Sequence, residues 1–170
     1  MEKLLSFLNQ IPEYSLLRKS TAVGVSSAVT GVGQINRSHL VAALKRDIDR
    51  PIVIIVQDDM AAKRLQEELK AFTGQTAPIL PSRELTLYDT AVVSRGWEQK
   101  RLRQLFDLAS GTVPMQIMSW ESLSQRTMPP EVLQNSAFTL TVGQEYPIDA
   151  LMDRLSGAGY TISFGELQMS

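Results

Sequence analysis

The first ten residues carry apolar side chains at helical spacing, which predicts a short amphipathic helix that closes at Pro12 and packs on the main body. Residues 21–27 are small and partly β-branched, and this pattern favours a strand. A glycine-rich turn follows at residues 30–33, and apolar positions then recur at helical spacing over residues 37–48. The pattern therefore predicts a strand, a loop and a helix in succession.

Residues 51–56 (PIVIIV) are continuously apolar and β-branched, which predicts a central parallel strand covered by helices on both faces. Asp58 and Asp59 follow as N-caps of a helix that extends to Phe72 and ends at Gly74. The chain continues in the same alternation, with a strand at 77–80, a helix at 94–109 that stops at Gly111, a strand at 115–118, helical turns at 121–126 and a short helix from Pro129 and Pro130.

Repeated alternation of strands and helices with short connections predicts an α/β fold with a doubly wound, mainly parallel sheet. In such sheets ligands bind at the carboxyl ends of the strands. The pattern changes near residue 136, which divides the chain into a first domain at residues 1–136 and a second at residues 137–170. In the second part, residues 138–142 alternate like a strand, a helix spans residues 147–155 before Gly157, and residues 160–163 suggest a last strand. This order predicts the start of a small α+β domain.

Composition narrows the chemistry. The chain has no cysteine and one histidine, which excludes disulfides, cysteine-rich zinc sites and thiol nucleophiles. No apolar run approaches the roughly 20 residues that a bilayer span needs, so we expect a cytoplasmic protein without membrane contact. The net charge of −1 gives no electrostatic argument for nucleic acid as the main ligand.

Residues 28–35 resemble part of a phosphate-binding loop. Such a loop has the pattern G-x-x-x-x-G-K-[ST]: its glycines let backbone N–H groups hold phosphate, its lysine neutralises charge and its hydroxyl holds magnesium. Here Gly31 and Gly33 keep part of the shape, but Gln34 stands at the lysine position and Ile35 at the hydroxyl position. Loss of these groups removes the charge compensation that phosphoryl transfer needs. The alternative is a glycine-rich turn that never bound a nucleotide.

For three other groups of residues, a functional role is compared with an ordinary structural role. His39 has no neighbouring ligand in the sequence and is expected at a surface or partly buried helix position. Asp58 and Asp59 follow the best strand, where catalytic acids often lie, but helix capping explains them better. The loop at residues 80–89 is expected to pack on the sheet, because it would otherwise expose apolar side chains.

Two functions of other classes stay open. One is a nucleotide- or small-molecule-binding enzyme domain that uses the strand ends near Gly31 and Asp58. The other is nonspecific DNA binding by a helix surface. The residues around Trp97 form either an aromatic and basic patch for nucleic acid or an ordinary solvated helix face. The cations of that surface are Arg95, Lys100, Arg101 and Arg103.

Four stretches taken in order resemble the N-terminal region of bacterial transcription-repair-coupling factors (Mfd). Residues 80–89 resemble that family's P-x-x-E-x-L-P-Y-D element, and residues 94–105 (SRGWEQKRLRQL) resemble its following S-x-x-x-x-x-x-R-L helix. Residues 118–130 (MSWESLSQRTMPP) are similar to a stretch that ends in L-x-Q-r-x-p-P. Residues 138–160 are similar to the family's L-x-V-G segment and the G-Y that closes its following helix. The resemblance covers roughly residues 15–160.

The resemblance implies a UvrB-like module: a RecA-like domain with a decayed nucleotide site, followed by the start of the domain that docks UvrA. It implies a catalytically silent regulatory part that needs no cofactor, has UvrA as its partner and uses Arg154 and Tyr160 for partner binding. In the family, DNA translocation and RNA-polymerase engagement belong to later domains, so DNA and RNA polymerase are partners only through the parent protein. After Tyr160 the chain departs from the family's P-G-x-F-x-x-R-G-G segment, and that segment's arginine is absent.

Overall fold

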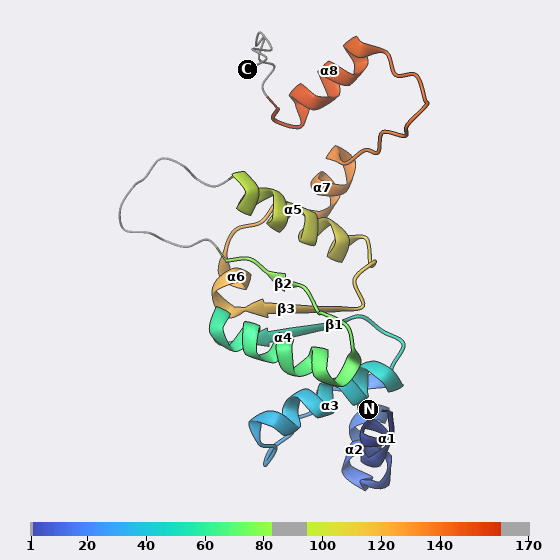
Figure 1. Cartoon of the computed structure of the whole chain (residues 1–170), viewed down its shortest axis with the longest axis vertical. Helices are drawn as coiled ribbons and strands as arrows, with labels where there is room; N and C mark the ends of the chain where they lie inside the picture. The colour runs from blue at the N-terminus through green and yellow to red at the C-terminus, as the bar shows by residue number, and fades with distance from the viewer. Residues whose placement is uncertain (1, 83–94, 161–170) are drawn as a thin grey trace, which may run out of the picture. The chain divides into compact units, whose positions relative to one another are not determined.

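The computed structural model describes residues 2–82 and 95–160, and the chain divides into two compact units, residues 1–126 and 127–170 (Figure 1). Each unit is described by itself. The boundary near residue 136 stays a prediction. The first unit contains α1 (Glu2–Ser6), the 3-10 helix η1 (Phe7–Gln10), α2 (Pro12–Ala22), α3 (Gln34–Asp47), β1 (Ile52–Val56), α4 (Asp59–Thr73), β2 (Ile79–Leu80), α5 (Arg95–Ala109), β3 (Met115–Ser119) and α6 (Trp120–Ser124), and the second contains α7 (Pro130–Ser136) and α8 (Ile148–Gly157).

The described strands form one parallel sheet in the order β1-β3-β2. Strand β3 lies in the centre and pairs with β1 from Ile52↔Met115 to Val56↔Ser119. The chain goes from β1 to β2 through α4 and returns to β3 through α5. Because such crossovers are right-handed, the two helices belong on opposite faces. Figure 1 shows α5 on one side of the sheet and α3 and α4 on the other. The predicted α/β class and the parallel pairing are confirmed.

The main core lies between the sheet and the layer formed by α3 and α4. Leu69 of α4 and Ile117 of β3 are completely buried there, next to the small side chains Ala43 of α3 and Ala62 of α4. The predicted ends of α4 are confirmed: Asp58 caps its first turn, and Gly74 follows its last residue with a φ of 73°. A left-handed backbone of this kind favours glycine, because a Cβ atom would be strained there.

Strand β1 is an edge strand of the described sheet, so the prediction that it is central and covered on both faces was wrong. Its alternate residues Ile52, Ile54 and Val56 pack against the core, whereas Val53 and Ile55 are 47% and 53% exposed. Helix α5 contacts β2, on the far side of β3, and leaves the same face of β1 open. A continuous apolar run does not show whether a strand lies at the centre or at the edge.

The predicted strand at residues 21–27 is absent from the structure. Helix α2 occupies Pro12–Ala22, and irregular chain then leads to Gly33. Pro12 closes the N-terminal helical segment as predicted, but it also starts α2, because proline is well suited to the first turn of a helix, where no N–H donor is needed. Helix α3 begins at Gln34 and not at Arg37, so Gln34 and Ile35 lie in its first turn. The arrangement around the glycine-rich segment is thus helix, loop, helix.

The second unit contains α7 and α8 but no strand at residues 138–142, where a strand was predicted. The predicted helix after Pro147 is confirmed. Residues 83–89 of the loop that was expected to pack on the sheet, and residues 161–163 of the last predicted strand, lie outside the described residues. Within the described ranges, no helix has both the length and the apolar character required to cross a bilayer.

A hydrogen-bonded cluster joins α2 to the end of α3. The buried Tyr14 hydroxyl donates to Asp47 Oδ2 at 2.7 Å, and Arg46 Nη2 donates to the same oxygen at 2.9 Å. Arg18 of α2 lies 3.9 Å from this carboxylate. The Arg46 hydrogen bond, followed by the Tyr14 hydrogen bond, lowers the pKa of Asp47, while burial opposes them. Burial and the bond to Asp47 raise the pKa of Tyr14. The cluster holds α2 against α3.

The Asp47 cluster makes stability depend on pH. The pKa of Asp47 is lower in the folded chain than its ordinary value of 3.8. The ionised carboxylate therefore stabilises the folded chain fully above pH 3.8, and this stabilisation is lost as the pH falls through the pKa of the folded state. We expect Asp47→Asn to lower the free energy of unfolding at pH 7 and to flatten its dependence on pH below about 5. Urea unfolding at a series of pH values measures both effects. The exposed neighbour Asp49 provides the control Asp49→Asn, and an equal effect of both variants would contradict the role of Asp47.

Candidate functional site around the glycine-rich segment

The glycine-rich segment at residues 28–35 leads directly into α3. Gly31 has a φ of 75°, and Gly33 is the N-cap of α3 in an extended conformation, with no side-chain hydrogen bond to the first turn. The first N–H groups of α3 therefore have no intrahelical or side-chain cap partner, as at an anion-binding helix terminus. Ile35, at the position where a metal-binding hydroxyl would stand, is 69% exposed. The segment follows α2 and not a strand, and it carries neither the lysine nor the hydroxyl of a phosphate loop.

On one side the segment borders a shallow pocket of about 550 Å³ lined by residues 33–36, Arg64 and Glu68. The opposite charges of Arg64 and Glu68 offset each other. Ser38 Oγ donates to Glu68, and Arg37 Nε donates to the carbonyl of Val32 at 3.3 Å. Arg37 thus turns back onto the segment's own backbone. The pocket offers no net positive charge to replace the missing lysine.

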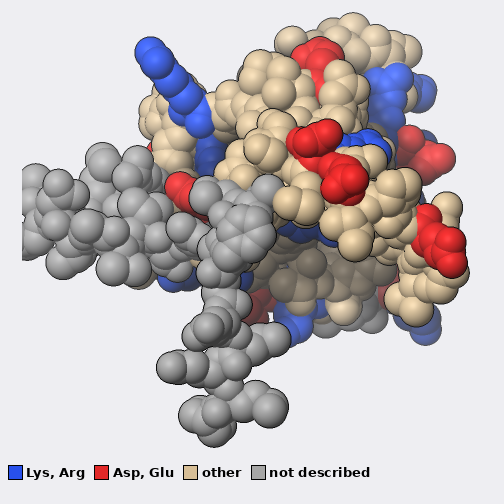
Figure 2. Space-filling view, turned by 90° about the horizontal axis from the view of Figure 1, so that it is seen from above, with Lys and Arg blue, Asp and Glu red and all other residues tan. Residues whose placement is uncertain are grey.

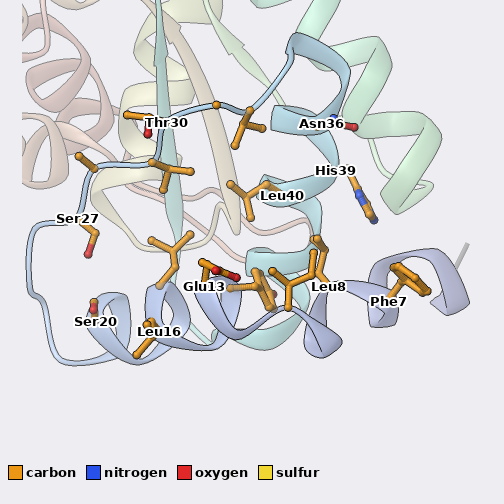
Figure 3. Close-up of a pocket in the computed structure, with 17 residues that line it drawn as sticks. Phe7, Leu8, Glu13, Leu16, Ser20, Ser27, Thr30, Asn36, His39 and Leu40 are labelled. Atoms are coloured by element: carbon orange, nitrogen blue, oxygen red, sulfur yellow. The ribbon is translucent and has the colours of Figure 1, made fainter.

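On its other side the segment borders a larger pocket of about 690 Å³ between η1, α2 and α3 (Figure 3). Most of its lining is apolar, and Glu13 is the only Asp, Glu, Lys or Arg side chain among the lining residues. His39 Nε2 lies 2.9 Å from the carbonyl of Leu4, and its ring stacks on Phe72 with ring centroids 5.2 Å apart. His39 is therefore the partly buried helix residue that the sequence predicts. An apolar pocket with a carboxylate disfavours a triphosphate.

The two acidic residues that follow β1 serve the structure around α4. Asp58 Oδ1 accepts a hydrogen bond from the N–H of Ala61 at 2.7 Å, and this bond is the main cause of the lowered pKa of Asp58. Asp59 accepts a hydrogen bond from Ser82 Oγ. The predicted capping role of Asp58 is confirmed, whereas that of Asp59 was wrong, because Asp59 is the first residue of α4 and its side chain bonds Ser82. Gly31 and Asp58 do not share either pocket beside the glycine-rich segment.

Arg101 occupies the carboxyl ends of β2 and β3, where a doubly wound sheet would receive a ligand. It is only 5% exposed, and it donates to the carbonyl of Pro81 at 2.7 Å and to the carbonyl of Ser122 at 2.9 Å. Its guanidinium lies 5.9 Å from the ring centre of Trp97, whose Nε1 donates to the carbonyl of Ser82 at 2.6 Å. Burial lowers the pKa of Arg101. The sequence predicted neither the burial of Arg101 nor this network.

The proposed DNA-binding surface on α5 is not assembled. Arg101 is buried and Trp97 is partly buried, so neither the aromatic and basic patch nor the fully solvated helix face describes α5. Arg103 forms an exposed pair with Asp107 at 3.1 Å, and Lys100 is exposed. The side chain of Arg95 lies outside the described residues. On the face shown in Figure 2, basic and acidic side chains are interspersed and do not form one large basic surface.

The second unit positions the two predicted partner-binding residues around α8. The Arg154 guanidinium lies 4.8 Å from the ring centre of Phe138. Tyr160 is 65% exposed, and its N–H donates to the carbonyl of Leu155 at 3.0 Å, which closes the end of α8. Among the residues that the structure describes, no three His, Asp or Glu side chains are grouped so as to hold a metal ion.

Comparison with known proteins finds relatives described as transcription-repair-coupling factors, among them those of three bacteria. The chain is 31% identical over 132 residues to the protein of Myxococcus xanthus, 31% over 121 residues to that of Escherichia coli and 29% over 108 residues to that of Haemophilus influenzae. These matches cover 73%, 71% and 64% of this chain but only 11%, 10% and 9% of the relatives. The chain thus spans about a tenth of the length of its curated relatives.

These matches confirm the family resemblance that the sequence motifs predict. No family model and no solved structure matches the chain.

The Arg101 network gives a stability prediction. We expect Arg101→Lys to lower the free energy of unfolding by about 1.5–3 kcal/mol, because one ammonium group cannot bond both carbonyls across which the guanidinium extends. Arg103→Lys is the matched control on the same helix, with an expected cost below about 0.5 kcal/mol for an exposed pair. Urea unfolding followed by circular dichroism measures both variants. A similar loss in the two would contradict the structural role of Arg101.

Proposed function

Because this chain is related in sequence to a segment of bacterial transcription-repair-coupling factors, we propose that it is a non-catalytic binding module of such a factor, with roles in UvrA recruitment and autoregulation. Its first unit is a degenerate RecA-like domain of the UvrB type, and its second is the start of a UvrA-docking domain. The parallel sheet with helices on opposite sides supports the RecA-like part of this proposal. DNA and RNA polymerase are contacted through the parent protein.

The observation that carries the non-catalytic role is the occupation of the strand ends by the chain's own side chains. Arg101 bonds the carbonyls of Pro81 and Ser122, Asp58 caps α4, and one oxygen of Asp59 accepts a hydrogen bond from Ser82 after β2. A nucleotide needs cations and free donors in this region to compensate its phosphate charge. The glycine-rich segment adds Gln34 and Ile35, which supply neither a cation nor a metal-binding oxygen.

The two predicted contact residues support the binding role. Arg154 and Tyr160 lie on the exposed surface around α8, and arginine and tyrosine are among the residue types enriched where proteins bind each other. Phe138 holds the guanidinium of Arg154 by a cation–π contact, which reduces the conformational freedom that binding would otherwise remove.

The non-catalytic role predicts that the purified chain does not hydrolyse ATP. We expect no magnesium-dependent phosphate release above the protein-free rate. The double variant Gln34→Lys with Ile35→Thr restores both missing side chains and serves as the matched comparison. We expect this variant to bind ATP more tightly but to remain without turnover, because the strand ends stay occupied by Arg101. Magnesium-dependent turnover by the unaltered chain would instead support the alternative of a nucleotide-binding enzyme domain.

The recruitment role predicts saturable binding of UvrA to the chain. We expect Arg154→Glu and Tyr160→Ala each to weaken this binding at least about fivefold, since each removes a contact side chain from the surface around α8. The control is Asp153→Asn, an exposed neighbour of Arg154 on the same helix, with an expected change below about twofold. Titration of the labelled chain with UvrA, followed by fluorescence anisotropy, measures the affinities. Absence of saturable binding by the unaltered chain would overturn the recruitment role.

A further inference from the structure

The larger pocket beside the glycine-rich segment has the form of a ligand site that the proposed function does not use. Three parts of the first unit enclose it: η1 and α2 on one side, residues 27–32 on another and α3 on a third (Figure 3). Its volume of about 690 Å³ lies within the range of roughly 300–1,000 Å³ that is typical of small-molecule sites. It lies outside the Arg101 network and outside the second unit that carries Arg154 and Tyr160.

Large apolar side chains gather around this one cavity while still partly in contact with solvent. Phe7, Ile11, Leu16 and Val29 line it and are between 38% and 65% exposed. Each of these side chains gains free energy when a ligand covers its remaining surface, at about 25 cal/mol per Å² of apolar area. Apolar side chains that converge on a concavity mark a binding surface more often than isolated ones do. The pocket therefore favours a ligand with an apolar body.

The polar groups of the pocket determine which end group such a ligand carries. Glu13 extends from the first turn of α2 and forms no ion pair or hydrogen bond with any residue that the structure describes. Thr30 and Asn36 contribute neutral hydrogen-bonding groups, and no lysine or arginine lines the cavity. His39 is turned to the carbonyl of Leu4 and the ring of Phe72. An unpaired carboxylate beside apolar walls attracts a cation and repels an anion.

We infer that this pocket binds an organic cation, a molecule whose apolar body lies between α2 and α3 and whose ammonium group pairs with Glu13. The apolar walls supply most of the affinity through area removed from water, and the carboxylate supplies the selectivity for charge. Because the pocket is formed within the first unit alone, the inference is independent of UvrA binding.

Three probes of similar size and different charge test the inference: 4-phenylbutylamine, 4-phenylbutanol and 5-phenylpentanoate. We expect saturable binding of the amine by isothermal titration calorimetry, about fivefold or more tighter than the alcohol and at least about tenfold tighter than the carboxylate. Amide chemical shifts of Thr30, Gly31 and Asn36 should move on titration with the amine, which locates the probe.

Variants separate the charge effect from the apolar one. Glu13→Gln should reduce the affinity for the amine to that for the alcohol and leave the alcohol unchanged. Val29→Lys, at an exposed lining position, should reverse the order and favour the carboxylate. The control is Glu67→Gln on the exposed side of α4, which should change no affinity. Equal binding of amine and carboxylate, no saturable binding of the amine, or an unchanged amine affinity in Glu13→Gln would each overturn the inference.

Discussion

Strand β3 has to be covered on both faces, since all five of its side chains are buried, and the rest of the first unit follows from that requirement. Met115 and Ile117 belong to the core that α3 and α4 complete. Gln116 points to the other face, where its amide donates to Gln104 of α5 at 3.3 Å and to the carbonyl of Pro78 at 3.0 Å. The amide N–H groups of a side chain buried in the central strand need such partners, although Oε1 of Gln116 has none among the described residues. Gln116 therefore helps to hold α5 over β2 and β3.

The position of α5 in turn determines which side chain occupies the carboxyl ends of β2 and β3. Once α5 lies over β2 and β3, Arg101 reaches the carbonyls of Pro81 and Ser122 and becomes buried there. A buried guanidinium is costly unless its donors are used, so these bonds are structural necessities of the fold. The same packing leaves Val53 and Ile55 of β1 uncovered. The first unit therefore combines occupied strand ends with an exposed face on the edge strand β1.

The structure gives the glycine-rich segment a different role from the one that its sequence motif suggests. In the sequence, residues 28–35 are compared with a phosphate-binding loop, and the missing lysine and hydroxyl speak only against phosphate binding. In three dimensions the segment forms one wall of an apolar cavity whose opposite wall carries Glu13. The chemistry of that cavity is the reverse of a phosphate site, since its charged group is an anion. The proposed loss of nucleotide binding and the proposed cation site are therefore compatible in the same segment.

The sequence alone predicted the features that depend on neighbouring residues. The cap at Asp58, the end of α4 at Gly74 and the helix after Pro147 depend on local hydrogen bonds and backbone angles, and all were confirmed. The family resemblance was also readable from ordered motifs. Helix α2 was missed although Pro12 gives a recognisable start signal at its first position.

Only the tertiary structure decided which strand is central, which charged side chains are buried and which segments line the same pocket. The run at residues 51–56 is more apolar than β3, yet the order β1-β3-β2 makes β3 the central strand, because strand order depends on contacts between distant segments. Arg101 and Arg103 look alike in the sequence, but only the side chain of Arg101 points to the strand ends. Local patterns specify helices and their ends, whereas burial and partnership depend on residues that are far apart along the chain.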